Sequence, residues 1–281
     1  GTPYDWYGCY DGKGHTIAWD VIPADSTMSF ATSEEGPYSS ILPKYTNVCE
    51  HLPIYFKAAH ENYAPTKAYV GYVTITQKVV TVTAPEASKV YLEPDPDVSS
   101  KKSESILGVI SGEDAETLIK YTLSLDKSYA DAGVGTYDRA VVASGQESQG
   151  NYKVFFKPNK LTVTNGTIII NPPTDPEDPS EPKPEGYEGT PYDWYGCYDG
   201  KGHTIAWDVI PADSTMSFAT SEEGPYSSIL PKYTNVCERL PIYFKAAHEN
   251  YEPTKAYVGY VTITQRVVTV TAPEKSKVYL S

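Results

Sequence analysis

Four cysteines are the residues of this chain best suited to covalent chemistry. They form two pairs with the same spacing, Cys9 with Cys49 and Cys197 with Cys237. Two cysteines in each of two similar stretches, and none elsewhere, are typical of an extracellular framework in which each pair closes one disulfide. In the chain-entropy model, a closed loop of roughly 40 residues stabilises a domain by about 4 kcal/mol. We therefore predict one disulfide within each pair.

Zinc binding and nucleophilic catalysis are the alternatives for the same residues. The first cysteine pair lies near His15 and His51, and together these side chains supply the ligand types of a zinc site. Arg239 stands where the second stretch would need the counterpart of His51, and a four-ligand site would not survive that change. A pair such as Cys9 with His15 could activate a thiol, but the spacing identifies no third, orienting group. We expect no metal, no cofactor, no catalytic residue and no enzymatic activity.

Aromatic residues near the start of each stretch are the best candidates for ligand contact. They are Trp6 and Tyr7 in the first stretch and Trp194 and Tyr195 in the second. Exposed Trp and Tyr rings stack on sugars or anchor protein contacts. The alternative is that the rings fill a small core, because the chain has 25 Tyr but only 6 Phe. We expect that role for Trp19, and both roles stay open for Trp6.

An internal repeat sets the organisation of the chain. Residues 1–93 recur as 189–281 with five differences, which indicates a recent duplication within a longer array. The predicted parts are module A (1–78), module B (79–171), a Pro- and acid-rich linker (172–188), a second module A (189–266) and the start of a second module B (267–281). The linker is expected to be an extended spacer on the order of 50 Å long. Residues 267–281 are expected to fray, or to pair as an exposed edge strand with another chain.

A hydrophobic period close to two residues predicts an all-β chain. The expected strands are 15–21, 27–32, 53–58, 67–77, 79–84, 152–157 and 160–164, and only 113–120 has helical character. Short, evenly spaced strands indicate tandem small immunoglobulin-like β-sandwich modules. A β-grasp-like fold is the alternative for module A, and we prefer the sandwich because no convincing helix lies between its strands.

Charge and hydropathy exclude several classes of function. A net charge of −13 argues against nucleic-acid binding, which needs a basic face, and suits a solvated extracellular protein. No stretch reaches the roughly 20 apolar residues of a membrane span. The acidic clusters at 93–97 and 175–178 lack the ordered spacing and glycine of a calcium loop.

Short motifs in both modules resemble known families. Module A resembles the YDG-type repeat of Gram-positive surface proteins through the run Tyr10-Asp11-Gly12-Lys13-Gly14-His15 near its start and Val73-Thr74-Ile75-Thr76 at its end. Module B is similar to the MBG family through Lys89-Val90-Tyr91 and Gly133-Val134-Gly135-Thr136-Tyr137. Together, the two resemblances cover nearly the whole chain except the linker. The Gly-x-Tyr pattern before a strand is also what a tyrosine corner needs, with the hydroxyl bonded to nearby backbone.

The resemblance implies a setting and a role. Such repeats occur in large adhesins and stalks, so it implies an extracellular location on the bacterial cell surface and a structural, adhesive function. The alternative is that module A itself binds a host glycan or an extracellular protein through Trp6, Tyr7 and their counterparts. Exposure of Trp6 would favour the binding alternative, and burial would favour the stalk.

Overall fold

The computed structural model describes residues 1–173 and 183–273. Strands dominate this part of the chain, where helical structure is limited to α1 (Ala115–Leu118) and the 3-10 turn η1 (Lys127–Tyr129). The prediction of an all-β, immunoglobulin-like chain is confirmed. The β-grasp alternative for module A is wrong, because residues 1–77 contain no helix to pack on the sheet.

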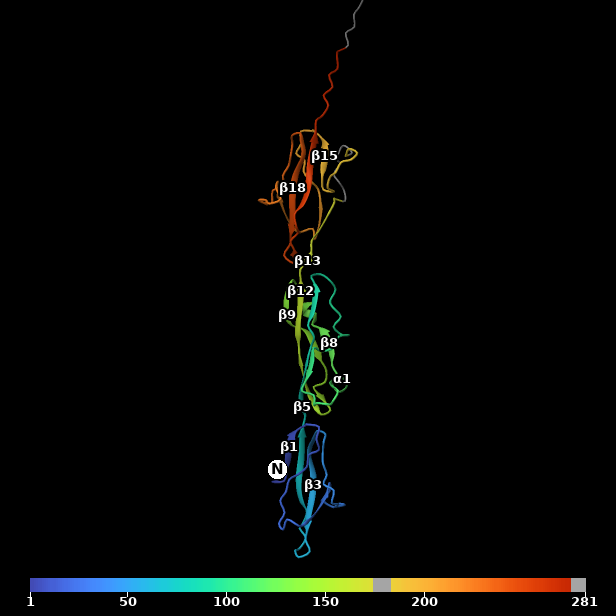
Figure 1. Ribbon diagram of the computed structural model, residues 1–281, viewed down its shortest axis with the longest axis vertical. Coiled ribbons are helices and arrows are strands. Elements are labelled where there is room, and N and C mark those ends of the chain that lie inside the picture. The colour runs from blue at the N-terminus through green and yellow to red at the C-terminus, as the bar shows by residue number, and fades with distance from the viewer. Residues whose placement is uncertain (174–182, 274–281) are drawn as a thin grey trace, which may run out of the picture. The chain divides into compact units, whose positions relative to one another are not determined.

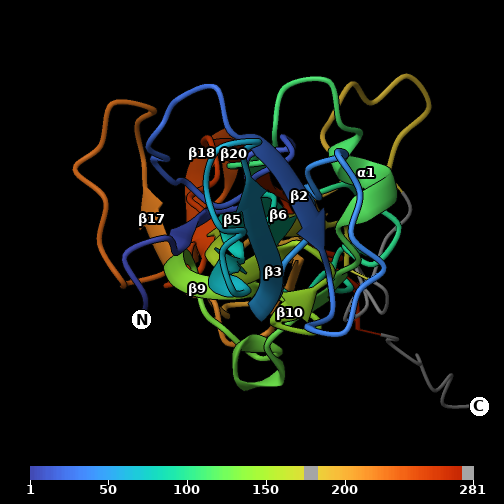
Figure 2. The ribbon, with the colours of Figure 1, turned by 90° about the horizontal axis from the view of Figure 1, so that it is seen from below.

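The first module A, where Figure 1 labels β1 and β3, is built on one four-stranded sheet with the order β1-β4-β3-β2. Its strands are β1 (Trp6–Cys9), β2 (Thr27–Ala31), β3 (Cys49–Ala59) and β4 (Tyr69–Thr76). β2 and β3 lie side by side and antiparallel (Figure 2). β1 is parallel to β4, with Trp6 opposite Val73 and Cys9 opposite Thr76.

The core of module A follows from the alternation of side chains along its strands. Ile54 and Phe56 of β3 are buried, as are Val73 and Ile75 of β4, whereas the residues between them are only half-buried. Full burial of each such side chain stabilises the fold by about 1.5–3 kcal/mol. This inward face is the one that the period-two pattern predicted.

Module B consists of two four-stranded sheets, with the orders β10-β11-β5-β7 and β6-β12-β9-β8. The strands are β5 (Lys78–Thr83), β6 (Ala87–Val90), β7 (Ser105–Leu107), β8 (Thr122–Leu125), β9 (Gly135–Ser144), β10 (Ser148–Gln149), β11 (Tyr152–Lys157) and β12 (Asn159–Thr164). β5 is parallel to β11. The Tyr137 hydroxyl donates a hydrogen bond to the Gly133 carbonyl at 2.8 Å, which is the bond expected of a tyrosine corner.

The chain divides into two compact units. One comprises Gly1–Lys89 and Glu93–Val163, and the other comprises Val90–Leu92 and the residues from Thr164 onward. The second unit holds the second module A, with the sheet order β15-β20-β18-β17. Its strands are β13 (Gly166–Thr167), β14 (Ile169–Asn171), β15 (Trp194–Cys197), β16 (Asp208–Ile210), β17 (Thr215–Ala219), β18 (Cys237–Ala247), β19 (Tyr251–Glu252) and β20 (Tyr257–Thr264).

One strand prediction is wrong, because the segment lacks a partner strand along most of its length. The predicted strand at 15–21 is reduced to a bridge between His15 and Tyr45. Residues 267–271 repeat the sequence of 79–83, yet form no strand. In the first instance β5 lies between β7 and β11, and Val80 is fully buried, whereas its counterpart Val268 is 84% exposed. Of the predicted linker, residues 174–182 lie outside the described part of the chain.

Candidate functional site

Trp6, a predicted ligand-contact residue, does not present an open ring. It is half-buried on β1, and its indole stacks on the imidazole of His15 with ring centroids 3.8 Å apart. The ring also covers Gly8, where an added Cβ would lie 2.5 Å from the indole Cη2. Trp194 makes the same stack on His203 at 3.7 Å. Each Trp is therefore committed to packing within its own module.

The neighbouring tyrosines differ between the two copies. Tyr7 is 75% exposed, whereas Tyr195 is half-buried. The ring of Tyr187 packs against Tyr195 at a centroid distance of 5.5 Å, and its hydroxyl bonds to Asp193 at 2.9 Å. Of the four predicted contact residues, Tyr7 presents the open aromatic surface.

The histidines under the Trp rings are held by aspartates. The His15 Nε2 lies 2.7 Å from the Asp11 carboxylate, and His203 and Asp199 show the same distance. The hydrogen bond from His15, together with one from the Lys13 backbone N–H, lowers the pKa of Asp11. The carboxylate thereby fixes the imidazole for stacking, which is a structural role.

The predicted disulfides are wrong, because all four cysteines carry thiols. Cys9 lies opposite Thr76 on β4, and Cys49 lies opposite Ile75 on the same strand. The two cysteines are therefore separated by two inter-strand spacings of about 4.8 Å each. Their combined distance exceeds the roughly 7 Å between Cα atoms that a disulfide can span. Adjacent residues of β4 also point to opposite faces of the sheet, so the two thiols do as well.

The second pair is arranged in the same way. Cys197 lies opposite Thr264 and has its Sγ 3.2 Å from the hydroxyl of that residue. Cys237 lies opposite Ile263, and its thiol contacts the Val261 carbonyl at 3.6 Å. In this copy too, a strand separates the two cysteines.

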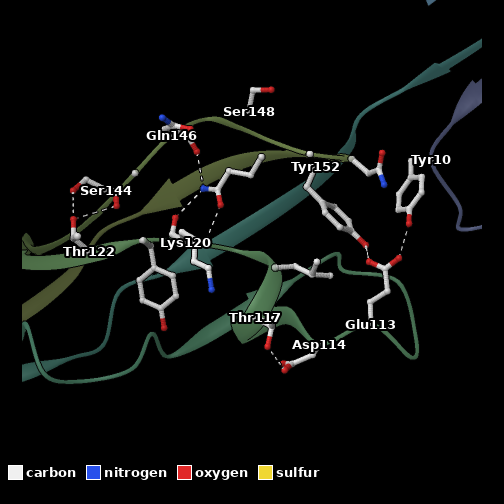
Figure 3. Close-up of a pocket in the computed structure, with 16 residues that line it drawn as sticks. Tyr10, Glu113, Asp114, Thr117, Lys120, Thr122, Ser144, Gln146, Ser148 and Tyr152 are labelled. Carbon is white, nitrogen blue, oxygen red and sulfur yellow. Dashed lines mark hydrogen bonds between the residues drawn. The ribbon is translucent and has the colours of Figure 1, made fainter. Parts of the chain in front are cut away.

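The candidate functional site lies where module A meets module B in the first unit. Glu113 there accepts a hydrogen bond from the Tyr10 hydroxyl at its Oε1 and one from the Tyr152 hydroxyl at its Oε2, both at 2.5 Å. Figure 3 shows the carboxylate lying between the two phenols. The rings of Tyr10 and Tyr152 pack edge to face at 5.6 Å. We call this cluster, together with Asn151, the A–B junction.

Backbone geometry positions these three side chains. Tyr10 directly follows β1, and its N–H donates to the Thr76 carbonyl at the end of β4. Tyr152 opens β11, and its hydroxyl also accepts the Ile110 N–H at 3.2 Å. Glu113 lies in a turn before α1, closed by a bond from its own N–H to the Ile110 carbonyl.

Asn151 adds direct bonds between the modules. Its Oδ1 accepts the Val48 N–H at 2.8 Å, and its Nδ2 donates to the Asn47 Oδ1 at 3.0 Å. The side chain of Gln77 donates to the Ser148 hydroxyl at 2.7 Å. The junction is thus a network of polar contacts around a small aromatic centre.

The environment favours the neutral form of both phenols. Burial, followed by the hydrogen bond to Glu113, raises the pKa of Tyr152 to about 12. The bond to Glu113 is the larger cause for Tyr10, whose pKa is also raised, with burial adding to it. Both hydroxyls remain donors to the carboxylate at neutral pH.

Comparison of the two copies shows what creates the junction. Tyr10 is 6% exposed, whereas Tyr198, its counterpart in the second module A, is 41% exposed. The sequences around them are identical. The burial of Tyr10 therefore comes from module B, and a property of module A alone does not account for it.

A pocket of about 840 Å³ adjoins the A–B junction (Figure 3). Carboxylates, an ammonium group, amides and phenols line it, including Glu113, Asp114, Lys120, Tyr121, Gln149 and Asn151. No Cys or His is among its lining residues. Such a set can bind a polar ligand through hydrogen bonds but contains no pair resembling an activated nucleophile and its base.

Within residues 1–173 and 183–273, no group of three or more His, Cys, Asp or Glu side chains is arranged to hold a metal ion. In the acidic run at 93–97, Asp95 pairs with Lys89 at 2.6 Å and Asp97 accepts bonds from Ser99. Among the described residues, no helix is long and apolar enough to cross a membrane.

Comparison with known proteins identifies one part of the chain. Residues 80–162 match the MBG domain of YGX type. This covers most of module B and supports the resemblance noted from its motifs. No curated protein matches the chain.

Solved structures resemble the chain only remotely. One is Drosophila N-cadherin EC1-4, with 12% identity and a TM-score of 0.33, covering 94% of this chain and 73% of that one. Another is the titin I-band fragment I67–I69, with 10% identity and a TM-score of 0.29, covering 94% and 96%.

Sequence reasoning did not identify the A–B junction. It placed Tyr10 in the YDG-type motif and Glu113 at the start of a helical stretch. The Tyr-rich composition and the position of Tyr10 at the end of a strand were the available signals. Neither signal indicates that the Tyr10 hydroxyl bonds to Glu113.

Proposed function

We propose that the chain is a structural, adhesive repeat region of a bacterial cell-surface protein, located outside the cell, whose modules bear tension and have no catalytic role. The MBG domain match at 80–162 supports a repeat module of this kind. The charge of −13 supports a solvated environment, because like-charged proteins remain soluble at high local density.

The observation that carries the proposal is the parallel pairing of the first and last strands of module A. The chain enters the module through β1 and leaves it through β4, and Trp6 to Cys9 lie opposite Val73 to Thr76. β15 and β20 repeat this arrangement in the second copy. Pulling the two ends of a module apart slides such strands along one another. Their hydrogen bonds are then loaded together and not broken one at a time.

The A–B junction supports the same function. A module that bears tension has to pass force to its neighbour without exposing its core. A single residue links Thr76 at the end of β4 to Lys78 at the start of β5. Next to this link, the hydrogen bonds of Glu113 and Asn151 connect the two modules through their side chains. These contacts would oppose bending between the modules.

Single-molecule force spectroscopy tests the proposal. The full chain is stretched through handles at its two termini, which shears β1 against β4. In a matched chain the handles are attached at positions 25 and 61, which flank adjacent ends of the antiparallel pair β2 and β3 and unzip it. We expect a severalfold higher unfolding force in the terminal geometry. Equal forces in the two geometries would overturn the proposal.

A second candidate function is ligand binding by module A. The exposed Tyr7 favours it, because an open phenol can stack on a sugar ring or anchor a protein contact. The expected ligand class is a host glycan or an extracellular protein. Binding to immobilised glycans should weaken at least tenfold when Tyr7→Ala and Tyr195→Ala are combined, and unchanged binding would exclude these residues from the contact.

A further inference from the structure

The core of the second module A includes residues from outside its sequence repeat. Ile168 and Ile170 are 5% and 6% exposed, and they cluster with Phe244 and Ile242. Both isoleucines precede the repeat, which begins at residue 189. The segment Thr164–Asn171 thus supplies apolar side chains that complete the core of this module.

The same segment also adds backbone pairing. β14 pairs antiparallel with β16, with Ile170 opposite Val209. β13 pairs in parallel with β19, with Thr167 opposite Glu252. The Asn165 amide donates to the Glu252 carboxylate at 2.9 Å. Two short strands and two isoleucines therefore attach this segment to module A.

The first module A has the same surface without a cover. Ile22 is 96% exposed, against 56% for its counterpart Ile210. Tyr63 is 62% exposed, whereas Tyr251 is half-buried. Residues 20–22, the counterparts of β16, form no strand. We call residues 20–22 and Tyr63 the acceptor surface.

One sequence difference bears on this contrast, because Ala64 cannot accept the bond that Asn165 donates to Glu252, but it does not account for the exposure of Ile22 and residues 20–22. Residues 11–50 and 199–238 are identical, and near the acceptor surface the copies differ only at Ala64 and Glu252. Ala58 of the first copy is half-buried and Ala246 of the second is buried, although their flanking sequences agree. The presence of the covering segment is therefore the cause.

We propose that the acceptor surface of the first module A binds a further copy of the segment Thr164–Asn171, carried by a module B of a neighbouring repeat. The occupant is a short extended segment whose isoleucines at alternate positions, the equivalents of Ile168 and Ile170, point to the same side and into the core. Its backbone adds to the edge at residues 20–22, as β14 adds to β16. The inference deepens the proposed function and rests on it, since it identifies the partner through which successive repeats connect.

An N-terminal extension tests the inference in the full chain. A second copy of residues 164–188 is placed directly before Gly1, which reproduces the arrangement before Gly189. The control extension carries Ile168→Asp and Ile170→Asp within the added copy only, so the original segment and the second module A are untouched. Both extended chains keep the original 281 residues unchanged.

Hydrogen exchange measured by mass spectrometry provides the readout. Peptides from residues 11–50 cannot be assigned to one copy, but peptides spanning 60–69 can, because position 64 is Ala and its counterpart 252 is Glu. We expect amide exchange in the Ala64 peptide to slow by about tenfold or more with the added segment, and to remain fast with the control. Equal exchange with both extensions would overturn the inference. That outcome would leave the force response of β1 and β4 unaffected, so the two proposals can fail separately.

Discussion

Tyr10 and Glu113 are 103 positions apart in the sequence, and a 2.5 Å hydrogen bond joins them. The bond crosses from module A to module B, and Tyr152 completes it from the opposite side of the carboxylate. A phenol that is exposed in an isolated module thereby becomes a donor in a buried cluster. Tyr198 has the same neighbours in sequence but is 41% exposed. The burial of Tyr10 is therefore caused by module B and not by the sequence of module A.

The first prediction uses these two tyrosines as a matched pair. Tyr10→Phe removes a hydrogen bond to a charged acceptor, so we expect a loss of about 2 kcal/mol of stability in the first module A. Tyr198→Phe should change stability by less than about 0.5 kcal/mol, because the ring is exposed. Native-state hydrogen exchange of peptides containing His51 or Arg239 distinguishes the copies. Equal effects of the two substitutions would contradict a role for Glu113.

The second prediction concerns pH. The pKa of Tyr152 is about 12 in the folded protein, above the value of about 10 for an unfolded tyrosine. The unfolded chain therefore loses this proton first, so the contribution is intact below about pH 10 and is lost as the pH rises towards 12. The full difference corresponds to about 2–3 kcal/mol.

A difference titration checks the pH prediction. Tyrosinate absorbance of the wild-type chain is compared with that of Tyr152→Phe, which isolates one phenol among 25. Glu113→Gln should lower the midpoint of the isolated transition, because the carboxylate no longer favours the protonated phenol. A midpoint near 10 in the wild-type chain would contradict the burial of this hydroxyl.

The sequence predicted those features that depend on local alternation. The inward faces of β3 and β4 follow from the period-two pattern around Ile54 and Val73, and β11 was predicted with its observed bounds. The helical stretch predicted at 113–120 is reduced to the single turn of α1. Asp114 caps that turn by accepting the Glu116 N–H, and extended backbone follows at Ile119.

Features that depend on a distant partner could not be predicted. Residues 208–210 form a strand, whereas their counterparts 20–22 do not. Nothing in either sequence distinguishes them. The disulfide prediction failed for a related reason, because spacing along the chain does not reveal that β4 lies between Cys9 and Cys49.

The third prediction tests the corrected state of the cysteines. All four thiols should be alkylated in denatured protein without reducing agent, and intact mass should record four additions. In native protein Cys9, which is exposed, should react faster than the half-buried Cys49. Alkylation that requires prior reduction would restore the disulfides and contradict the strand order.

The fourth prediction concerns the Trp–His stack. Gly8→Ala places a Cβ about 2.5 Å from the Trp6 indole, so the ring has to leave its position over His15. We expect a loss of about 1–3 kcal/mol, typical of overpacking, and a change in tryptophan fluorescence. Gly196→Ala should act equally on Trp194, where the added Cβ would lie 2.7 Å from the ring. Unchanged fluorescence in both variants would contradict the stack.

We conclude that the A–B junction holds the two modules of the first unit as one body. Residual dipolar couplings, measured on the full chain with isotope label confined to residues 1–163, report the relative orientation of the two modules. We expect couplings from 1–76 and 78–163 to fit a single alignment tensor. Glu113→Ala should separate them into two tensors, whereas Glu116→Ala, at an exposed neighbour, should not. Two distinct tensors in the wild-type chain would contradict the claim.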